Sequence, residues 1–326
     1  MLHQLRLGLG HFVARRVIFR QPSQVTRSVV TSAALNQEST KMRLVQFVHN
    51  EEQRVGVEQG NGDIIDLNVD PTFPKDMVNF LKGGDTLLRK AKEIATAAKS
   101  VHPKDSIKLI SPITNPEKVL CIGMNYVDHC EEQNQPVPKE PVVFNKFASC
   151  IVGPTDDVIY PDETEQLDWE VELVIVIGKS GKNIKEEDAM SHIFGYTVAH
   201  DVSARDWQML RNGKQWLLGK AMDTFCPLGP AIVTTDSLSD PHNLGLRCRV
   251  NGKTMQDSTT KNLVFKSEQL IAFVSRFMTL TPGDIILTGT PPGVGVFCKP
   301  EPIFLKRGDV VECEVDEIGT ITNKIV

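Results

Sequence analysis

Residues 167–178 read Leu167-Asp168-Trp169-Glu170-Val171-Glu172-Leu173-Val174-Ile175-Val176-Ile177-Gly178, and this stretch decides the fold. A run rich in Val and Ile is typical of a β-strand. Side chains at positions i and i+2 of a strand point the same way, so Glu170 and Glu172 stand together on one face. Two carboxylates in apolar surroundings repel unless a shared proton or a cation relieves them, and a hard divalent cation is one solution. The other interpretation is an edge strand with a solvated face, because Glu is mostly exposed in proteins.

The overall composition is that of an ordinary globular protein. The chain has 326 residues, 40% of them hydrophobic and 24% charged, which is enough to bury a large core. No run of about 18 apolar residues occurs, so we expect no membrane-spanning helix. The seven cysteines are scattered and form no CxxC pair, which indicates reduced thiols in an intracellular compartment rather than disulfides or a zinc site.

The first 37 residues have a composition of their own. They contain five arginines and several Ser and Thr, and no acidic residue precedes Glu38. This pattern predicts a mitochondrial presequence over residues 1–37, with a disordered basic tail as the alternative. Removing five arginines from a chain of net charge −5 leaves about −10 on the remainder. Such an acidic body, without a basic patch, is not expected to bind nucleic acid.

Changes in hydrophobic pattern divide the remainder into two predicted domains. Residues 42–112 begin with short alternating strands and continue with two segments of helical spacing, which predicts a small β/α domain. Prolines between Ser111 and Pro116 predict a linker. Residues 113–326 are predicted to be rich in strands, at 118–122, 142–145, 170–177, 194–201, 229–234, 246–250, 284–288 and 309–316.

Local signals in the larger domain add a hairpin and two helices. Asn251-Gly252 predicts a hairpin turn. Ser203-Ala204-Arg205-Asp206 resembles a capping box that opens a helix, and a second helix from Ser267 has Leu270, Ile271, Val274, Phe277 and Met278 on one face. Long alternation of strands and helices is absent, which excludes a Rossmann or barrel pattern. The pattern therefore predicts an α+β, β-rich fold.

Other polar residues stand where catalysis could use them. Asp201 ends a predicted strand and is either a third carboxylate of a cluster or a turn residue. Lys220 lies among apolar and small residues, where it could stabilise an oxyanion, although a lone Lys is usually a surface residue. His129 and Glu132 share a face if their segment is helical, which suits a general base oriented by a carboxylate, and an exposed polar helix is the alternative.

A glycine-rich loop, Leu287–Gly295, follows a predicted strand, and its backbone N–H groups could approach an anion. The loop lacks the GK[ST] ending of a nucleotide-binding P-loop.

The order of these motifs resembles the fumarylacetoacetate hydrolase family. The motifs are Gly-x-Asn-Tyr at 123–126, His-x-x-Glu at 129–132, Glu-x-Glu at 170–172, then Asp201, Lys220 and Thr-Gly-Thr-Pro-x-Gly-Val-Gly at 288–295. The resemblance covers residues 115–326, including the stretch 304–312. Residues 42–110 look like the small N-terminal domain that many members carry. With the basic leader, the chain looks most like mitochondrial animal members of the family.

The resemblance implies a mixed β-roll catalytic domain, usually a homodimer, that binds Mg²⁺ (or Mn²⁺ or Ca²⁺). Glu170, Glu172 and Asp201 match the metal ligands of the family. His129 and Glu132 match a catalytic dyad on a lid, and Lys220 matches the active-site lysine. The positions that line the pocket in relatives correspond to Lys146, Arg205, Gln208 and Thr290.

The family acts on small β-dicarbonyl or 2-oxo acids. The resemblance implies keto–enol tautomerisation of oxaloacetate in the mitochondrial matrix as the first hypothesis. Hydrolysis of acylpyruvates or decarboxylation of oxaloacetate is the alternative, since all three reactions pass through an enolate. A catalytically silent metal-binding or interaction protein on the same fold is a hypothesis of a different class.

Overall fold

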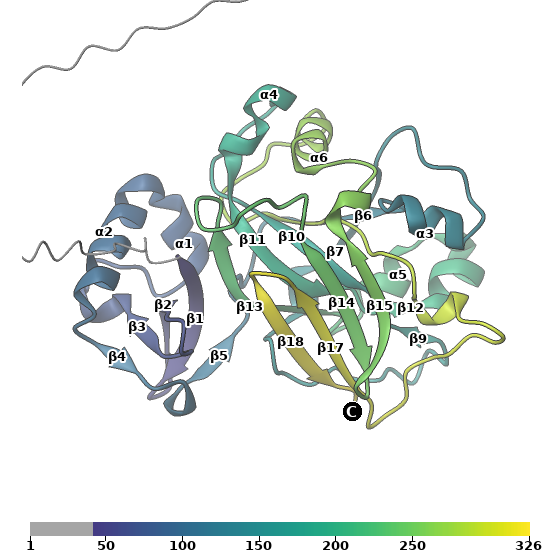
Figure 1. The fold of residues 1–326 in the computed structure, drawn as a ribbon, viewed down its shortest axis with the longest axis horizontal. Coiled ribbons are helices and arrows are strands. Elements are labelled where there is room, and N and C mark those ends of the chain that lie inside the picture. The colour runs from purple at the N-terminus through teal and green to yellow at the C-terminus, as the bar shows by residue number, and fades with distance from the viewer. Residues whose placement is uncertain (1–41) are drawn as a thin grey trace, which may run out of the picture. The chain divides into compact units, whose positions relative to one another are not determined.

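A twelve-stranded mixed sheet runs through residues 42–326, the part of the chain that the computed structural model describes (Figure 1). The predicted presequence, residues 1–37, lies outside the described residues. The strand order is β4 (Val101–His102), β3 (Ile64–Asp66), β2 (Glu52–Glu58), β1 (Arg43–His49), β13 (Cys226–Thr234), β11 (Ile193–His200), β10 (Val171–Ile177), β16 (Ile285–Leu287), β6 (Val119–Gly123) and β7 (Val142–Lys146). Two short strands join off this path, β5 (Lys108–Ile110) beside β1 and β8 (Ile151–Val152) beside β13.

Strands β1, β2 and β3 form the predicted meander, and two helices follow it. They are α1 (Met77–Lys82) and α2 (Gly84–Ala97). Asp76 caps α1 by accepting a hydrogen bond from the backbone of Asn79, and Met77, Phe80 and Leu81 are buried at helical spacing. Because β1 pairs with β13, the sheet continues from this part into the rest of the chain. The boundary between domains 42–112 and 113–326 stays a prediction.

Strand β10 lies inside the sheet, with β11 on one side and β16 on the other. All seven of its residues are buried, so the interpretation of this stretch as a solvated edge strand is wrong. Glu172 lies on a strand that pairs with a neighbour on both sides, and the residue is 1% exposed. The sheet therefore places acidic side chains in the interior, where they must be compensated.

A second sheet carries the predicted hairpin. Its order is β15 (Lys253–Thr259), β14 (Gly245–Val250), β17 (Val310–Val315) and β18 (Gly319–Lys324), and it packs across β10, β11 and β13 (Figure 1). The turn residues Asn251 and Gly252 both have positive φ, 51° and 78°, as the predicted turn requires. The eight predicted strands are all present, and the α+β, strand-rich class is confirmed.

The two predicted helices of this part had different outcomes. Helix α6 (Ser267–Val274) buries Leu270, Ile271 and Val274, but it ends before Phe277, which is exposed. The capping box at Ser203 is wrong. Ser203 belongs to β12 (Ser203–Ala204), which pairs with β9 (Leu167–Asp168), and its hydroxyl donates to the carbonyl of Asp201 instead of capping a helix.

The remaining helices are short. A π-helical turn, Asp206–Leu210, follows β12, and α3 (Val127–Glu132), α4 (Glu186–Ala189) and α5 (Leu217–Lys220) complete the set of α-helices among the described residues. Within residues 42–326, no helix has the length and apolar character needed to cross a membrane.

Candidate active site

Three buried carboxylates meet where β10 begins and β11 ends. Carboxylate oxygens of Glu170, Glu172 and Asp201 lie within 4.8 Å of one another, and the three residues are 5%, 1% and 0% exposed. Adjacent strands cause the meeting, because Val171 pairs with His200 and the backbone N–H of Asp201 donates to the carbonyl of Glu170 at 2.9 Å. The structure thus brings together the three residues predicted as metal ligands.

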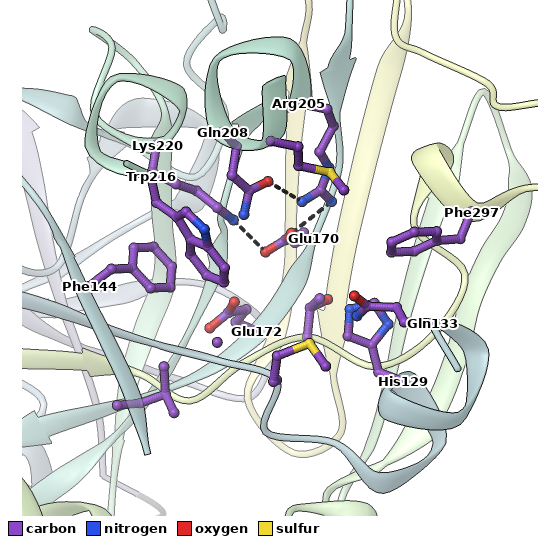
Figure 2. Close-up of a pocket in the computed structure, with 15 residues that line it drawn as sticks. His129, Gln133, Phe144, Glu170, Glu172, Arg205, Gln208, Trp216, Lys220 and Phe297 are labelled. Atoms are coloured by element: carbon purple, nitrogen blue, oxygen red, sulfur yellow. Dashed lines mark hydrogen bonds and ion pairs between the residues drawn. The ribbon is translucent and has the colours of Figure 1, made fainter. Parts of the chain in front are cut away.

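Three buried cations surround these carboxylates. Lys220 Nζ lies 2.8 Å from Glu170 Oε2 and 3.0 Å from Asp201 Oδ2. Lys146 Nζ lies 2.7 Å from Asp201 Oδ1, and Arg205 Nη2 lies 2.7 Å from Glu170 Oε1. Every oxygen of Glu170 and Asp201 therefore has a cationic partner. Figure 2 shows the ion pairs of Glu170 with Arg205 and Lys220.

Glu172 is the carboxylate left over. Its Oε2 accepts a hydrogen bond from the backbone N–H of Gly289 at 2.7 Å, but no Lys or Arg of residues 42–326 forms an ion pair with it. Burial raises the pKa of Glu172 well above its usual range, and the neighbouring Asp201 and Glu170 raise it further. For Glu170, burial acts in the same direction, but Lys220 and Arg205 outweigh it and lower the pKa to about 2.

The donor set fits a hard divalent cation. Three carboxylates supply oxygen ligands, which Mg²⁺, Mn²⁺ and Ca²⁺ prefer. The surplus negative charge at Glu172 has no protein counter-ion among the described residues, and a bound cation would neutralise it. A buried acidic triad of this kind could hold a metal, and Glu170, Glu172 and Asp201 are the residues that would do so.

The predicted dyad lies on α3, beside the carboxylates. His129 Nδ1 is 2.8 Å from Glu132 Oε2, so the expected i, i+3 contact is present. The other oxygen of Glu132 accepts from the backbone N–H of Gly293 at 2.9 Å. Asn125, just before α3, donates a hydrogen bond from its side-chain amide to the carbonyl of Phe265 and accepts one from the backbone N–H of Phe265, which fixes the start of the segment. The dyad is therefore held against the glycine-rich loop 287–295.

A small cavity connects the dyad and the carboxylates. It has a volume of about 90 Å³. Figure 2 shows Glu170 and Glu172 between Trp216 and Phe144 on one side and His129 and Phe297 on the other. The residues predicted to bind substrate divide into two groups. Those that line the cavity are Arg205, Gln208 and Thr290, whereas Lys146 lies behind Asp201 and donates to the carbonyl of Val202 at 3.1 Å.

Several residues of the site had no predicted role. Asp168 shares the two-residue period of Glu170 and Glu172, and this period was a usable signal that it belongs with them. Gln133, Phe144, Trp216 and Phe297 line the cavity from segments far apart in the chain, so no local pattern indicates them. Gly123 must be Gly, because a Cβ there would lie 2.6 Å from the Trp216 ring.

Comparison with known families and curated proteins agrees with this geometry. The family model described as "Fumarylacetoacetate (FAA) hydrolase C-terminal" matches residues 118–326. The mitochondrial oxaloacetate tautomerase of Xenopus laevis is 61% identical over 304 residues, covering 92% of this chain and 93% of the relative. A mitochondrial oxaloacetate tautomerase of Homo sapiens is 60% identical over 294 residues, covering 89% and 93%.

Solved structures show the same fold. A fumarylacetoacetate hydrolase from Exiguobacterium antarcticum has a TM-score of 0.77 at 35% identity, covering 87% of this chain and 99% of that chain. A maleylpyruvate hydrolase from Sphingobium has a TM-score of 0.72 at 33% identity, with the same coverage.

Proposed function

The chain belongs to the fumarylacetoacetate hydrolase family, and on that basis we propose that it is a mitochondrial oxaloacetate tautomerase that depends on a divalent metal. The observation that carries the proposal is the buried carboxylate triad with its surplus negative charge. Two of its members, Glu170 and Glu172, line a small cavity beside a His–Glu dyad. Curated relatives that are about as long as this chain and 60% identical to it bear this activity in their names. The leader composition supports import into the mitochondrial matrix.

Glu170, Glu172 and Asp201 would hold the metal, and we propose Mg²⁺, with Mn²⁺ or Ca²⁺ as alternatives. When bound, such a cation acts as a Lewis acid that polarises the keto group of a 2-oxo acid and makes the adjacent C–H more acidic.

The protein's own cations would bind and orient the substrate. Arg205 lines the cavity, where its guanidinium would bind a substrate carboxylate. Its Nη1 donates to Gln208 Oε1 at 2.8 Å, which leaves the amide N–H groups of Gln208 to donate to the same carboxylate. Lys220 places positive charge at the cavity, where it would stabilise the oxygen that becomes negative as the enolate forms. Thr290 completes the lining, and Lys146 acts from behind Asp201.

His129 would move the proton. Glu132 binds its Nδ1, so Nε2 is the nitrogen available to take a proton from the carbon next to the keto group. In the keto-to-enol direction His129 takes the proton from that carbon and releases it to solvent, while the keto oxygen takes a proton from solvent. In the reverse direction the protonated His129 gives a proton to the carbon, and the enol oxygen loses its proton to solvent. Tautomerisation needs nothing else, since no carbon–carbon bond is broken.

Hydrolysis of acylpyruvates is the second candidate, because the same dyad could activate a water molecule. The structural neighbour from Sphingobium is named a maleylpyruvate hydrolase. Decarboxylation of oxaloacetate would use the same carboxylate triad and the same cavity.

We also propose that the protein is a homodimer. An apolar surface hollow is lined by Phe147, Trp207, Leu217, Leu218, Ala221 and Met222, together with Glu163. Phe147 and Leu218 are 51% and 46% exposed, and a second copy of the chain would cover them. Light scattering on the purified protein tests the dimer, and Leu218→Asp should shift it to the monomer if this hollow is the interface.

Rapid-mixing ultraviolet absorbance of enol-oxaloacetate tests the function. Protein with Mg²⁺ should accelerate the loss of the enol without releasing pyruvate, and EDTA should abolish the acceleration. Pyruvate release would indicate a decarboxylase instead. Decay at the buffer rate would reject the tautomerase, and cleavage of acylpyruvates by the same protein would then establish the hydrolase.

A further inference from the structure

Asp168 is a buried carboxylate to which the proposed reaction assigns no role. It is 0% exposed and accepts four hydrogen bonds. Its Oδ1 accepts from the backbone N–H groups of Gly295 at 2.7 Å and Trp169 at 2.8 Å. Its Oδ2 accepts from the backbone of Val296 at 3.0 Å and from Arg205 Nε at 2.7 Å. With all four donors in place, this carboxylate has one fixed orientation next to the guanidinium.

Arg205 is held on three sides. Besides the bond to Asp168, Nη1 donates to Gln208 Oε1 at 2.8 Å and Nη2 lies 2.7 Å from Glu170 Oε1. The guanidinium is planar and rigid, so fixing Nε fixes the directions of all its other N–H groups. Asp168 also supplies a negative charge that offsets the charge of Arg205. Without that charge, Arg205 would attract Glu170 more strongly, and Glu170 is one of the carboxylates available to a metal.

The turn at residues 293–297 connects the same carboxylate to the dyad. Gly293 at its start donates to Glu132, at 2.9 Å. The two central N–H groups donate to Asp168, as described above. Phe297 at its end lines the cavity, with its ring centroid 6.1 Å from that of His129. Asp168 therefore holds Arg205 on one side and a wall of the cavity on the other.

We propose that Asp168 is a positioning residue that orients Arg205 toward the substrate's acid group and holds the 293–297 turn in register with it. The proposal rests on the proposed function, in which Arg205 binds substrate. Asp168 itself does not line the cavity, so it acts through Arg205. Because Asp168 shares a period of two with Glu170 and Glu172, one segment supplies two of the three proposed metal ligands and also the residue that aligns Arg205 beside them.

The test is a double-mutant cycle on oxalate binding in the presence of Mg²⁺, measured by isothermal titration calorimetry. Oxalate is a small dicarboxylate that cannot tautomerise, so its affinity reports orientation rather than chemistry. Asp168→Asn keeps the size of the side chain but removes its charge. We expect it to weaken oxalate binding about 10- to 100-fold, the range seen when a residue that orients a metal ligand is lost.

Arg205→Ala and the double variant complete the cycle. If Asp168 acts through Arg205, Asp168→Asn should change oxalate affinity less than about twofold when Arg205 is already absent. Equal losses in both backgrounds would overturn the proposal, because Asp168 would then act independently of Arg205.

Asp284→Asn is the matched control for a general loss of stability. Asp284 is also 0% exposed and accepts from the backbone of Lys118 at 3.0 Å and of Thr281 at 2.8 Å, but it does not line the cavity. It should lower the melting temperature and leave oxalate affinity unchanged. A comparable loss of oxalate affinity in this control would overturn the proposal. Failure of the wild type to tautomerise oxaloacetate would instead reject the proposed function, while the binding cycle still decides the role of Asp168.

Discussion

Two networks of charged side chains in this protein each contain one more carboxylate than cations, but their surroundings differ. The network at the cavity has four carboxylates and three cations, namely Asp168, Glu170, Glu172 and Asp201 with Lys146, Arg205 and Lys220. The network on the four-stranded sheet has three carboxylates and two cations, namely Glu312, Glu314 and Asp316 with Arg247 and Arg249. The side chains of the ion pairs at the cavity are at most 7% exposed, whereas those on the sheet are 24% to 46% exposed.

The difference teaches that solvent, and not the count of charges, decides which network needs a ligand. On the sheet, water screens the extra carboxylate, and the hydrogen bond from Arg247 holds the pKa of Glu314 below its usual value. At the cavity, burial raises the pKa of Glu172 well above its usual value. The buried surplus must therefore be relieved by a proton or by a cation.

The largest expected effect is on the turnover of the Glu172→Ala variant. Removing a proposed metal ligand should lower kcat/KM for enol-oxaloacetate by at least about 100-fold, because even residues that only support such ligands contribute 10- to 100-fold. Stopped-flow absorbance at saturating Mg²⁺ measures the loss. Turnover within about threefold of the wild type would show that the buried surplus is not the metal site.

His129→Ala should also lower turnover, but for a different reason. A general acid–base group contributes about 100-fold or more to the rate, so kcat should fall by that amount. Mg²⁺ affinity should stay the same, because His129 is not a member of the carboxylate cluster. A variant with unchanged kcat would remove the dyad from the mechanism, and a variant that loses Mg²⁺ would place His129 in the metal site.

The surplus also predicts how the stability of the metal-free protein depends on pH. The raised pKa of Glu172 means that the folded chain keeps a proton that the unfolded chain releases. This contribution is fully present below the ordinary value of 4.5 and is lost as pH rises through the folded pKa. Glu172→Gln is uncharged at every pH, so in EDTA its advantage in free energy of unfolding over the wild type should grow from about pH 5 to about pH 8. Urea unfolding at the two pH values would contradict this if the difference between the proteins stayed constant.

The smallest effect is expected on the sheet. Glu314→Gln removes a partner of Arg247 and Arg249, and the free energy of unfolding should fall by no more than about 1 kcal/mol. Enol-oxaloacetate turnover should not change. A loss of several kcal/mol would mean that the exposed ion pairs stabilise the fold as strongly as buried ones. Solvent would then not explain the difference between the two networks.

Sequence patterns predicted the strands and the acidic cluster because both depend on local periodicity. The Val- and Ile-rich run predicted β10, and the i, i+2 spacing predicted that Glu170 and Glu172 face the same way. The pattern could not tell an interior strand from an edge strand. That distinction depends on β16, which lies more than a hundred residues further along the chain.

Other features could not be predicted correctly because they depend on tertiary structure. Ser203 looks like a helix cap, yet its hydroxyl bonds the carbonyl of Asp201 because β12 pairs with β9 there. The cavity wall joins Phe144, Trp216 and Phe297, whose meeting no local signal predicts. Lys146 was assigned to the pocket by family resemblance, whereas its position behind Asp201 is known only from the folded chain.

Calorimetric titration of Mg²⁺ into the metal-free protein, with Glu172→Gln as the comparison, tests whether the buried charge at Glu172 binds the metal. We expect one Mg²⁺ site per chain in the wild type and the loss of that site in the variant, because the charge that Mg²⁺ would neutralise is gone. Equal Mg²⁺ affinity in the two proteins would contradict it, since the buried surplus at Glu172 would then not be what binds the metal.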